Sequence, residues 1–454
     1  MNLSPGRSLV ARYVVRGIVA VAAVLIIGLL WVVLGPGPTD FAGGGRVALA
    51  AYRVADPTGV PPELAAAGLA RRGEYLAWAA DCEACHTAPG GAPYAGGLAF
   101  VLPFGTLYST NITPDKETGI GSYSDADFLN VIHKGIGRGG ARLYPAMPYA
   151  AYTYMTDADA LAIKAYLFGL KPVHAPARAN TLSFPANQRW LMAVWSSLFN
   201  PDRRFEPNPE RSVPWNRGAY LVEAMAHCGD CHTPRNSMQA LNNRAKFAGT
   251  VISGWRAYNI TSDRDSGVGA WSDADLSQYL AIGHADMHGA AAGPMSEAVD
   301  KSLSHLTQAD ITAMVTYLRS VPAITTADLP APNAKPAPPS HKEGVAANLE
   351  PRGKAIFEGA CASCHGWSGV SPLTSFATLT GARAVNDPTA LNVAQVVLSG
   401  AQRRTPVGRV LMPAFGHSYT DAEIASVANY VTARFGAKPS AITADRIAQL
   451  REAN

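Results

Sequence analysis

Three short stretches of the chain place two cysteines three positions apart, and a histidine follows each pair at once. The thiols are those of Cys82, Cys85, Cys228, Cys231, Cys361 and Cys364, which are all six cysteines of the 454-residue chain, and the histidines are His86, His232 and His365. A Cys-x-x-Cys-His stretch is the sequence at which a c-type haem is attached. The thiols form thioethers with the haem, and the histidine becomes the proximal ligand of the iron. The sequence therefore predicts three covalently bound haem c groups.

Paired cysteines also occur in zinc sites, in thioredoxin-like redox motifs and in the structural disulfides of exported proteins. Zinc normally takes two such pairs that lie close together, whereas long stretches of sequence separate these three pairs. None of the alternatives gives a reason for the histidine that follows every pair. The motif therefore favours haem attachment over a metal site or a disulfide.

The ligand on the other face of each iron decides whether the haem transfers electrons or binds small molecules. A methionine opposite the histidine raises the reduction potential and closes the iron to other ligands. In the first and third repeats a methionine stands beside a proline, shortly before the last helix expected there. These residues are Met147 and Met412, and we expect both to be axial ligands.

The middle repeat offers more than one candidate for the second axial ligand. Met295 follows a proline, and its separation from His232 is close to the separation of the corresponding pair in the first repeat. We therefore predict Met295 as the ligand. Met287, His284 and His288 remain alternatives, and a histidine there would lower the potential of that haem.

The other histidines and methionines are interpreted as surface, hydrogen-bonded or packing residues. They include His133, His227, His305, His417, Met155, Met192, Met225, Met238 and Met314.

The composition excludes several other functions. The net charge of +4 is too small to indicate a nucleic-acid partner, and no basic cluster with interleaved aromatic residues is present. No cysteine remains for an iron–sulfur cluster, and the chain has no Gly-x-Gly-x-x-Gly or Gly-x-x-x-x-Gly-Lys sequence for a nucleotide. The sequence thus indicates an electron carrier that has no substrate-oxidising site of its own.

The elements that must position the haems repeat along the chain. Before each cysteine pair, a basic residue and a glycine precede apolar residues at helical spacing, beginning near residues 71, 216 and 351. Each repeat is expected to close with a helix whose N-cap is Thr156, Thr307 or Thr420, followed by acidic residues in the first turn. Residues 111–113 and 119–128 of the first repeat also match residues 259–261 and 267–276 of the second.

These repeats predict an all-α protein with three tandem class I cytochrome c domains. The expected domains are residues 70–185, 214–322 and 350–438. The expected remainder is a cytoplasmic N-terminus with a transmembrane anchor (1–38), a linker (39–69), an apolar connector (186–213), a proline-rich semi-rigid linker (323–349) and a C-terminal tail (439–454).

An uncharged apolar run extends over residues 17–35 and is about long enough to cross a bilayer as a helix. Arg7, Arg12 and Arg16 precede it without any acidic residue, which places the N-terminus in the cytoplasm and the later residues outside. The alternative is a signal peptide cleaved after Ala48-Leu49-Ala50. We favour a retained anchor, because that site lies well beyond the apolar run.

The connector 186–213 contains a cluster of apolar residues that includes Trp190 and Trp195. Such clusters usually pack internally, so packing between haem domains is the favoured interpretation. The alternative is a docking surface for a partner subunit or for the membrane interface, where tryptophan favours the water boundary.

Four stretches resemble one family of cytochromes. Residues 94–97, 108–115, 144–149 and 228–235, together with the three haem motifs, resemble the cytochrome c subunit of membrane-bound periplasmic dehydrogenases. Members of this family serve quinoprotein alcohol dehydrogenases, flavin-dependent sugar-acid or polyol dehydrogenases, and molybdenum-dependent aldehyde dehydrogenases. The resemblance covers about residues 70–437. It implies that a separate catalytic subunit oxidises the substrate, that three haems relay the electrons, and that ubiquinone in the membrane accepts them.

On this resemblance, the pairs His86/Met147, His232/Met295 and His365/Met412 fall on the family's ligand positions. The alcohol-oxidising members have a cleaved signal and a long C-terminal extension, whereas this chain has an N-terminal apolar run and ends soon after its last expected helix. Its layout looks more like that of aldehyde dehydrogenases with a molybdopterin subunit and a small iron–sulfur subunit. A cytochrome peroxidase and a free-standing cytochrome that feeds a terminal oxidase are the competing hypotheses.

Overall fold

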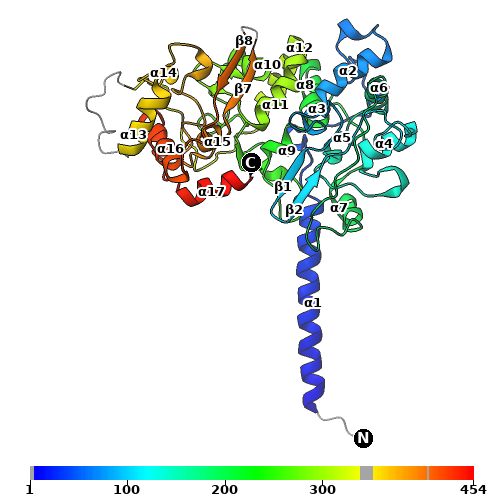
Figure 1. Cartoon of the computed structure of the whole chain (residues 1–454). Coiled ribbons are helices and arrows are strands. Elements are labelled where there is room, and N and C mark those ends of the chain that lie inside the picture. Colours follow the sequence, from blue (N-terminus) through cyan, green and yellow to red (C-terminus); the bar gives the residue numbers. More distant parts are fainter. Residues whose placement is uncertain (1–4, 338–350, 406–407, 454) are drawn as a thin grey trace.

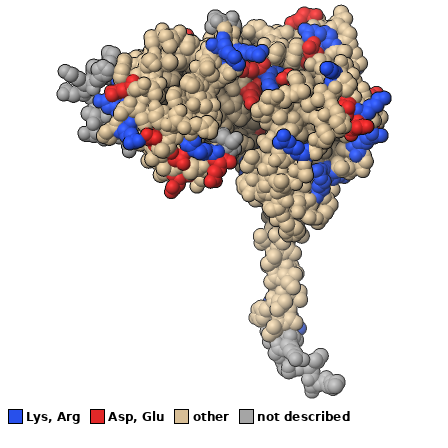
Figure 2. Space-filling model, in the orientation of Figure 1, with Lys and Arg blue, Asp and Glu red and all other residues tan. Residues whose placement is uncertain are grey.

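The computed structural model describes residues 5–337, 351–405 and 408–453 of the chain. One long helix, α1 (Pro5–Val33), stands out from a body of shorter helices and small hairpins (Figure 1). Its segment Val10–Val32 has a mean hydropathy of 2.5 and is long and apolar enough to cross a membrane. That segment is not buried against the body, and on the face shown in Figure 2 nearly all of it lacks charged side chains.

The body repeats one arrangement, in which an opening helix leads into a cysteine pair and a longer closing helix ends the repeat. The first repeat contains α2 (Leu69–Ala79), α3 (Cys82–Cys85), β1 (Ala99–Leu102), β2 (Gly105–Tyr108), α4 (Asp125–Lys134), α5 (Tyr149–Tyr152) and α6 (Asp157–Phe168). The connector holds α7 (Leu191–Phe199).

The second repeat contains α8 (Val213–Ala219), η5 (Tyr220–Met225), α9 (Gly229–His232), β3 (Thr250–Ile252), β4 (Trp255–Ala257), α10 (Asp273–Ile282), β5 (His284–Ala285), β6 (Gly289–Ala290), α11 (Pro294–Lys301), η7 (Leu303–His305) and α12 (Gln308–Arg319). The third contains α13 (Pro351–Ile356), η9 (Phe357–Cys361), α14 (Ala362–His365), α15 (Leu391–Ser399), β7 (Ala401–Thr405), β8 (Gly408–Met412), α16 (Asp421–Phe435) and α17 (Ala444–Ala453). Within the described residues the strands form only two-stranded antiparallel hairpins, so the predicted all-α class is confirmed.

A glycine lets the opening and closing helices of each repeat touch backbone to backbone. A Cβ atom on Gly73 would lie 1.7 Å from the carbonyl oxygen of Ala162, which belongs to α6. A Cβ atom on Gly218 would lie 2.0 Å from the Ala313 oxygen of α12, and one on Gly353 would lie 2.2 Å from the Ser426 oxygen of α16. The repeated basic-Gly sequence therefore marks the crossing point of the two helices.

The three predicted threonine N-caps are present at the closing helices. The Thr156 side chain accepts a hydrogen bond from the Asp159 amide, and Thr307 accepts one from the Asp310 amide. Thr420 forms a full capping box with Glu423 at the start of α16. Each cap satisfies an amide that the helix cannot pair by itself.

The first and second repeats share one hydrophobic core, which contains Leu76 of α2 and Leu221 of η5. The third repeat has its own core around Phe357 and Phe435. The α17 helix contributes fully buried Leu450 to that core, so part of the segment expected as a tail packs into the third repeat.

Polar contacts attach the third repeat to the second. The Arg256 side chain reaches Asp387, which is fully buried, at 3.1 Å. Arg403 lies 2.9 Å from Asp300 and also donates a hydrogen bond to the Ile282 carbonyl at the end of α10. Asp328, from the expected linker, completes the cluster by pairing with Arg256. The described part of the linker 323–349 is therefore held between the two repeats.

Candidate haem sites

Each predicted proximal histidine is oriented by a backbone carbonyl. The Nδ1 atom of His86 lies 2.7 Å from the Thr110 oxygen. The Nδ1 atom of His232 lies 2.6 Å from the Tyr258 oxygen, and that of His365 lies 2.6 Å from the Ala377 oxygen. A histidine that donates Nδ1–H to a carbonyl presents Nε2 as its metal-binding nitrogen. All three rings are therefore placed alike, with Nε2 available for an iron.

Burial keeps these imidazoles in the form that binds a metal. The pKa of His86, of His232 and of His365 is lowered, chiefly because burial disfavours the charged ring. The carbonyl hydrogen bond opposes this effect in each case. A neutral imidazole has a lone pair on Nε2, so the donor set fits a haem iron.

A repeated asparagine fixes the carbonyl in the first two repeats. Asn111 directly follows Thr110, and its side chain accepts a hydrogen bond from the Thr113 amide and donates one to the Val173 carbonyl. This asparagine closes the loop onto the segment that follows α6. The loop therefore holds the Thr110 oxygen where the His86 ring needs it.

The second repeat uses the same device. Asn259 follows Tyr258, accepts from the Thr261 amide at 2.8 Å and donates to the Ile324 carbonyl at 2.6 Å. The sequence match between residues 111–113 and 259–261 thus has a structural reason that the sequence did not reveal. These residues position the histidine without touching it.

The six cysteines form no disulfide, and they stand at the ends of the opening helices or on the short helices that follow. Burial raises the pKa of Cys82 and Cys228 to about 12 and that of Cys361 to about 11. Both sulfurs of each pair are therefore available to form thioethers with a haem. Among the described residues, no group of three or more His, Cys, Asp and Glu side chains is placed to hold a metal ion.

The predicted methionine ligands occupy different settings. Met147 precedes α5 and Met295 is the second residue of α11, and both pack against the core that the first two repeats share. The Cys82 and Cys228 side chains pack against the same core. Met412 is the last residue of β8, paired with Ala401, and not part of a free loop. All three assignments stay predictions.

The alternatives in the middle repeat have other contacts. Met287 is 39% exposed and sits at the turn between β5 and β6. The buried His284 ring has both nitrogens engaged, with the Gly289 carbonyl at 3.0 Å and with Asp286 at 3.1 Å. His288 stacks on Trp271 at a centroid distance of 3.8 Å. These contacts favour Met295.

Family models match two of the repeats. The model described as "Cytochrome c" matches residues 70–171, and "Cytochrome C oxidase, cbb3-type, subunit III" matches residues 348–431. Each matched stretch includes one haem motif and the helix crossing described above. The fold and these sites define a multidomain c-type cytochrome with covalently bound haem c.

Curated relatives match over most of the chain. The "Fructose dehydrogenase cytochrome subunit" of Gluconobacter japonicus is 41% identical, over 87% of this chain and 85% of the relative. The "Gluconate 2-dehydrogenase cytochrome c subunit" of Pantoea cypripedii is 39% identical, over 85% and 90%. The "Alcohol dehydrogenase (quinone), cytochrome c subunit" of Gluconobacter oxydans is 37% identical, over 84% and 82%. The chain belongs to the family of cytochrome c subunits of membrane-bound dehydrogenases, which confirms the resemblance noted in its sequence.

Proposed function

We propose that the chain carries three haems and relays electrons from a catalytic dehydrogenase subunit to ubiquinone in the membrane. The proposed ligand pairs are His86/Met147, His232/Met295 and His365/Met412. The observation that carries this proposal is the histidine–carbonyl arrangement, which recurs at all three motifs. With His and Met ligands, a haem iron exchanges single electrons and is closed to other ligands.

The residues around the sites support a relay. The shared core of the first two repeats would hold two haem sites at a fixed separation, because one cysteine of each pair, Cys82 or Cys228, packs against that core. The Arg256–Asp387 and Arg403–Asp300 contacts fix the third repeat against the second. A rigid arrangement keeps the distances between neighbouring sites constant, which electron transfer requires. No step needs a catalytic side chain.

An electron-transfer assay with the isolated holoprotein and its complex tests this function. The isolated chain is expected to oxidise neither alcohols nor aldehydes, and its haems are expected to be reduced by substrate only when the catalytic subunit is present. Optical spectra of the haems report the result. Reduction of the haems by substrate in the isolated chain would overturn the proposal.

We infer that α1 stays in the membrane as an anchor, with the haem domains on the periplasmic side. The Arg244 guanidinium lies 3.7 Å from the centre of the Trp31 ring and donates a hydrogen bond to the Trp31 carbonyl. Arg244 therefore joins the end of α1 to the second repeat. A helix that is held in this way orients the body relative to the bilayer.

A group of exposed apolar side chains supports a second membrane contact. This basal apolar surface consists of Phe184, Trp190, Val194 and Met238, which are 79%, 65%, 48% and 41% exposed. The Trp195 indole of α7 donates to the Met238 carbonyl, and Met238 precedes Arg244 in the same loop. In Figure 1, α7 lies at the end of the body from which α1 leaves. Contact with the outer leaflet would cover this surface.

Fractionation tests both membrane contacts. A variant that lacks residues 1–36 and carries a cleavable signal is expected to remain partly membrane-bound. Adding Phe184→Ser and Trp190→Ser should release it into the soluble fraction. Full release by the deletion alone would show that the basal apolar surface does not bind lipid. A membrane-bound triple variant would assign retention to the partner subunit.

The catalytic partner that we propose first is a molybdopterin-type aldehyde dehydrogenase with a small iron–sulfur subunit. The apolar N-terminal helix supports this choice, because that layout is the one the sequence resembles. A quinoprotein alcohol dehydrogenase or a flavin-dependent sugar or gluconate dehydrogenase is the second candidate, and the names of the relatives favour it. Purification of the complex from detergent extracts, followed by cofactor analysis, distinguishes them. Molybdenum supports the first, and flavin or pyrroloquinoline quinone supports the second.

A further inference from the structure

The segment that carries Met295 has a counterpart in the first repeat. The helix before it, α4 or α10, ends in both repeats at a glycine with a left-handed backbone, and the carbonyl of that glycine accepts a 2.8 Å hydrogen bond from the amide eight residues later. The predicted methionine ligand stands four residues beyond that amide. We call these two segments, residues 135–147 and 283–295, the distal loops of the first and second repeats.

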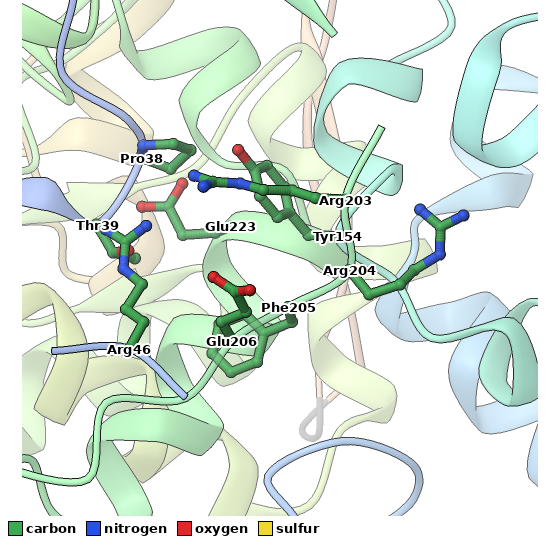
Figure 3. A pocket seen from close by; sticks show the side chains of 9 residues that line it. All are labelled: Pro38, Thr39, Arg46, Tyr154, Arg203, Arg204, Phe205, Glu206 and Glu223. Carbon is green, nitrogen blue, oxygen red and sulfur yellow. The ribbon is translucent and has the colours of Figure 1, made fainter. Parts of the chain in front are cut away.

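The connector holds the first distal loop. The Arg189 guanidinium donates a 2.9 Å hydrogen bond to the Arg142 carbonyl within the loop. Arg204, at the other end of the connector, donates one of 2.8 Å to the Thr153 carbonyl, just beyond α5. In Figure 3 the Arg204 side chain points away from Glu223. Two arginines of the connector therefore fix the first distal loop and the short helix that follows it.

A residue of the third repeat holds the second distal loop. Arg403 of β7 is 3% exposed, and it donates hydrogen bonds to the Ile282 carbonyl at 3.0 Å and to the Ala291 carbonyl at 3.4 Å. It also pairs with Asp300 of α11 at 2.9 Å. These three partners lie just before the loop, within it and after it. One buried side chain therefore contacts the chain on both sides of Met295.

Two glycines let the second distal loop approach its neighbours closely. A Cβ atom on Gly283 would lie 2.1 Å from the Arg403 guanidinium, and one on Gly293 would lie 2.5 Å from the Trp255 ring of β4. Both glycines have a positive φ, of 68° and 55°, which other residues rarely adopt. The loop is therefore packed between Trp255 of its own repeat and Arg403 of the third.

The chemistry of Arg403 suits this arrangement. A guanidinium presents its N–H groups in a rigid plane, so it donates to several oxygens at once, whereas a lysine ammonium is a single point on a flexible chain. The Asp300 carboxylate balances the buried positive charge. The buried Ala291 carbonyl would lose a partner without Arg403, and an unpaired buried carbonyl is destabilising.

We propose that Arg403 of the third repeat is a positioning residue that holds Met295 at the iron of the middle haem. This inference rests on the proposed function, because it takes Met295 as the second ligand of that iron. The strand of Arg403 pairs with β8, which ends at Met412, so one hairpin carries the predicted ligand of the third site and braces the second. Through this side chain the third repeat sets the ligation, and with it the reduction potential, of a haem in another repeat.

Carbon monoxide binding to the reduced, full-length holoprotein in detergent tests the proposal. In Arg403→Leu the haems are expected to stay attached, while the middle iron loses its methionine and binds about one carbon monoxide per molecule, where the wild type binds none. The potential of that haem should also fall, because methionine ligation raises it. We expect its ratio of reduced to oxidised form at a fixed ambient potential to fall about tenfold, which is about 59 mV for one electron.

Three variants separate the role of Arg403 from that of its surroundings. Arg403→Lys keeps the charge without the planar fork and should bind less carbon monoxide than Arg403→Leu. Arg404→Leu removes the same charge from the next, exposed position of β7 and should leave the spectra unchanged. Arg256→Leu breaks the other ion pairs that attach the third repeat, those with Asp328 and Asp387, and should also bind none. Equal binding in Arg256→Leu and Arg403→Leu would assign the effect to lost docking and overturn the proposal.

A double variant identifies the iron that opens. Arg403→Leu combined with Met295→Leu should bind no more carbon monoxide than Met295→Leu alone, because both changes act on one iron. More binding in the double variant would show that Arg403→Leu opens a different haem, which would overturn the inference. A closed iron in Arg403→Leu beside an open one in Met295→Leu would overturn it as well, and would leave the ligand and the relay standing. A closed iron in Met295→Leu would overturn the ligand assignment together with the inference.

Discussion

The Tyr75 hydroxyl of the first repeat donates a 2.6 Å hydrogen bond to Asp310, in the closing helix of the second repeat. The reciprocal contact is also made, because the Tyr220 hydroxyl of the second repeat donates to Asp159 in the closing helix of the first, again at 2.6 Å. Both acids are buried, being 3% and 2% exposed. The opening helix of each repeat thus binds the closing helix of the other, which explains why the two share one core.

The two tyrosines should differ in their contribution to stability. When the Tyr75 hydroxyl is removed, Asp310 keeps two hydrogen bonds from Arg217. When the Tyr220 hydroxyl is removed, Asp159 keeps one hydrogen bond, from the Gly59 amide. We expect Tyr75→Phe to lower the free energy of unfolding by about 1 kcal/mol and Tyr220→Phe by about 2–3 kcal/mol, because a buried carboxylate with fewer partners costs more. Chemical unfolding followed through the haem absorbance measures both. Equal losses would contradict this assignment.

Alanine at the helix crossing should destabilise the third repeat strongly. In Gly353→Ala the new methyl group would overlap the Ser426 carbonyl of α16, and we expect a loss of about 3 kcal/mol or more. Gly359→Ala is the control in the same repeat, because a Cβ there meets no atom within 4 Å. It should be neutral or slightly stabilising. Thermal unfolding compares the two, and similar effects would show that the crossing is not close.

Removal of a distal methionine should open one iron. Met412→Leu is expected to leave the haem attached and to let carbon monoxide bind to the reduced protein, because leucine has no ligand atom. Met295→Leu should have the same effect on the middle haem, whereas Met287→Leu should not. Difference spectra with carbon monoxide measure this, and Met238→Leu serves as the control. Unchanged spectra for Met412→Leu would place the ligand elsewhere.

The capping box of α16 should make the free energy of unfolding depend on pH. Hydrogen bonds from Thr420 and the nearby Arg352 lower the pKa of Glu423 to about 2, from its ordinary value of 4.5. A folded-state pKa below the unfolded value contributes stability above about pH 4.5, and this contribution is lost as the pH falls through about 2. The stability difference between wild type and Glu423→Gln should therefore shrink over that range. A difference that stays constant from pH 7 to pH 2 would contradict this account.

Local patterns in the sequence predicted the local features of the fold. The threonine caps, the basic-Gly crossings and the cysteine–histidine motifs each involve residues that are close in sequence, or that recur at a fixed spacing. The role of Asn111 and Asn259 could not be predicted in this way. Their repeat was visible, but the carbonyls that they position face histidines elsewhere in the chain.

The pairing of the first two repeats could not be predicted from the sequence either. Tyr75 and Asp310 are 235 positions apart, and no local pattern indicates that they meet. The sequence favours internal packing for the connector, with a docking surface as the alternative, and the structure has Trp195 buried against Tyr149 and Trp190 exposed. A helical period alone does not tell which side of such a segment another element covers.

The number and position of the haems are the central claim, and the mass of the mature protein tests it most directly. Intact mass spectrometry is expected to give the polypeptide plus three haems, and peptide mapping to find one on each pair, Cys82/Cys85, Cys228/Cys231 and Cys361/Cys364. A mature protein with fewer than three haems, or with free thiols at any of these pairs, would contradict the account.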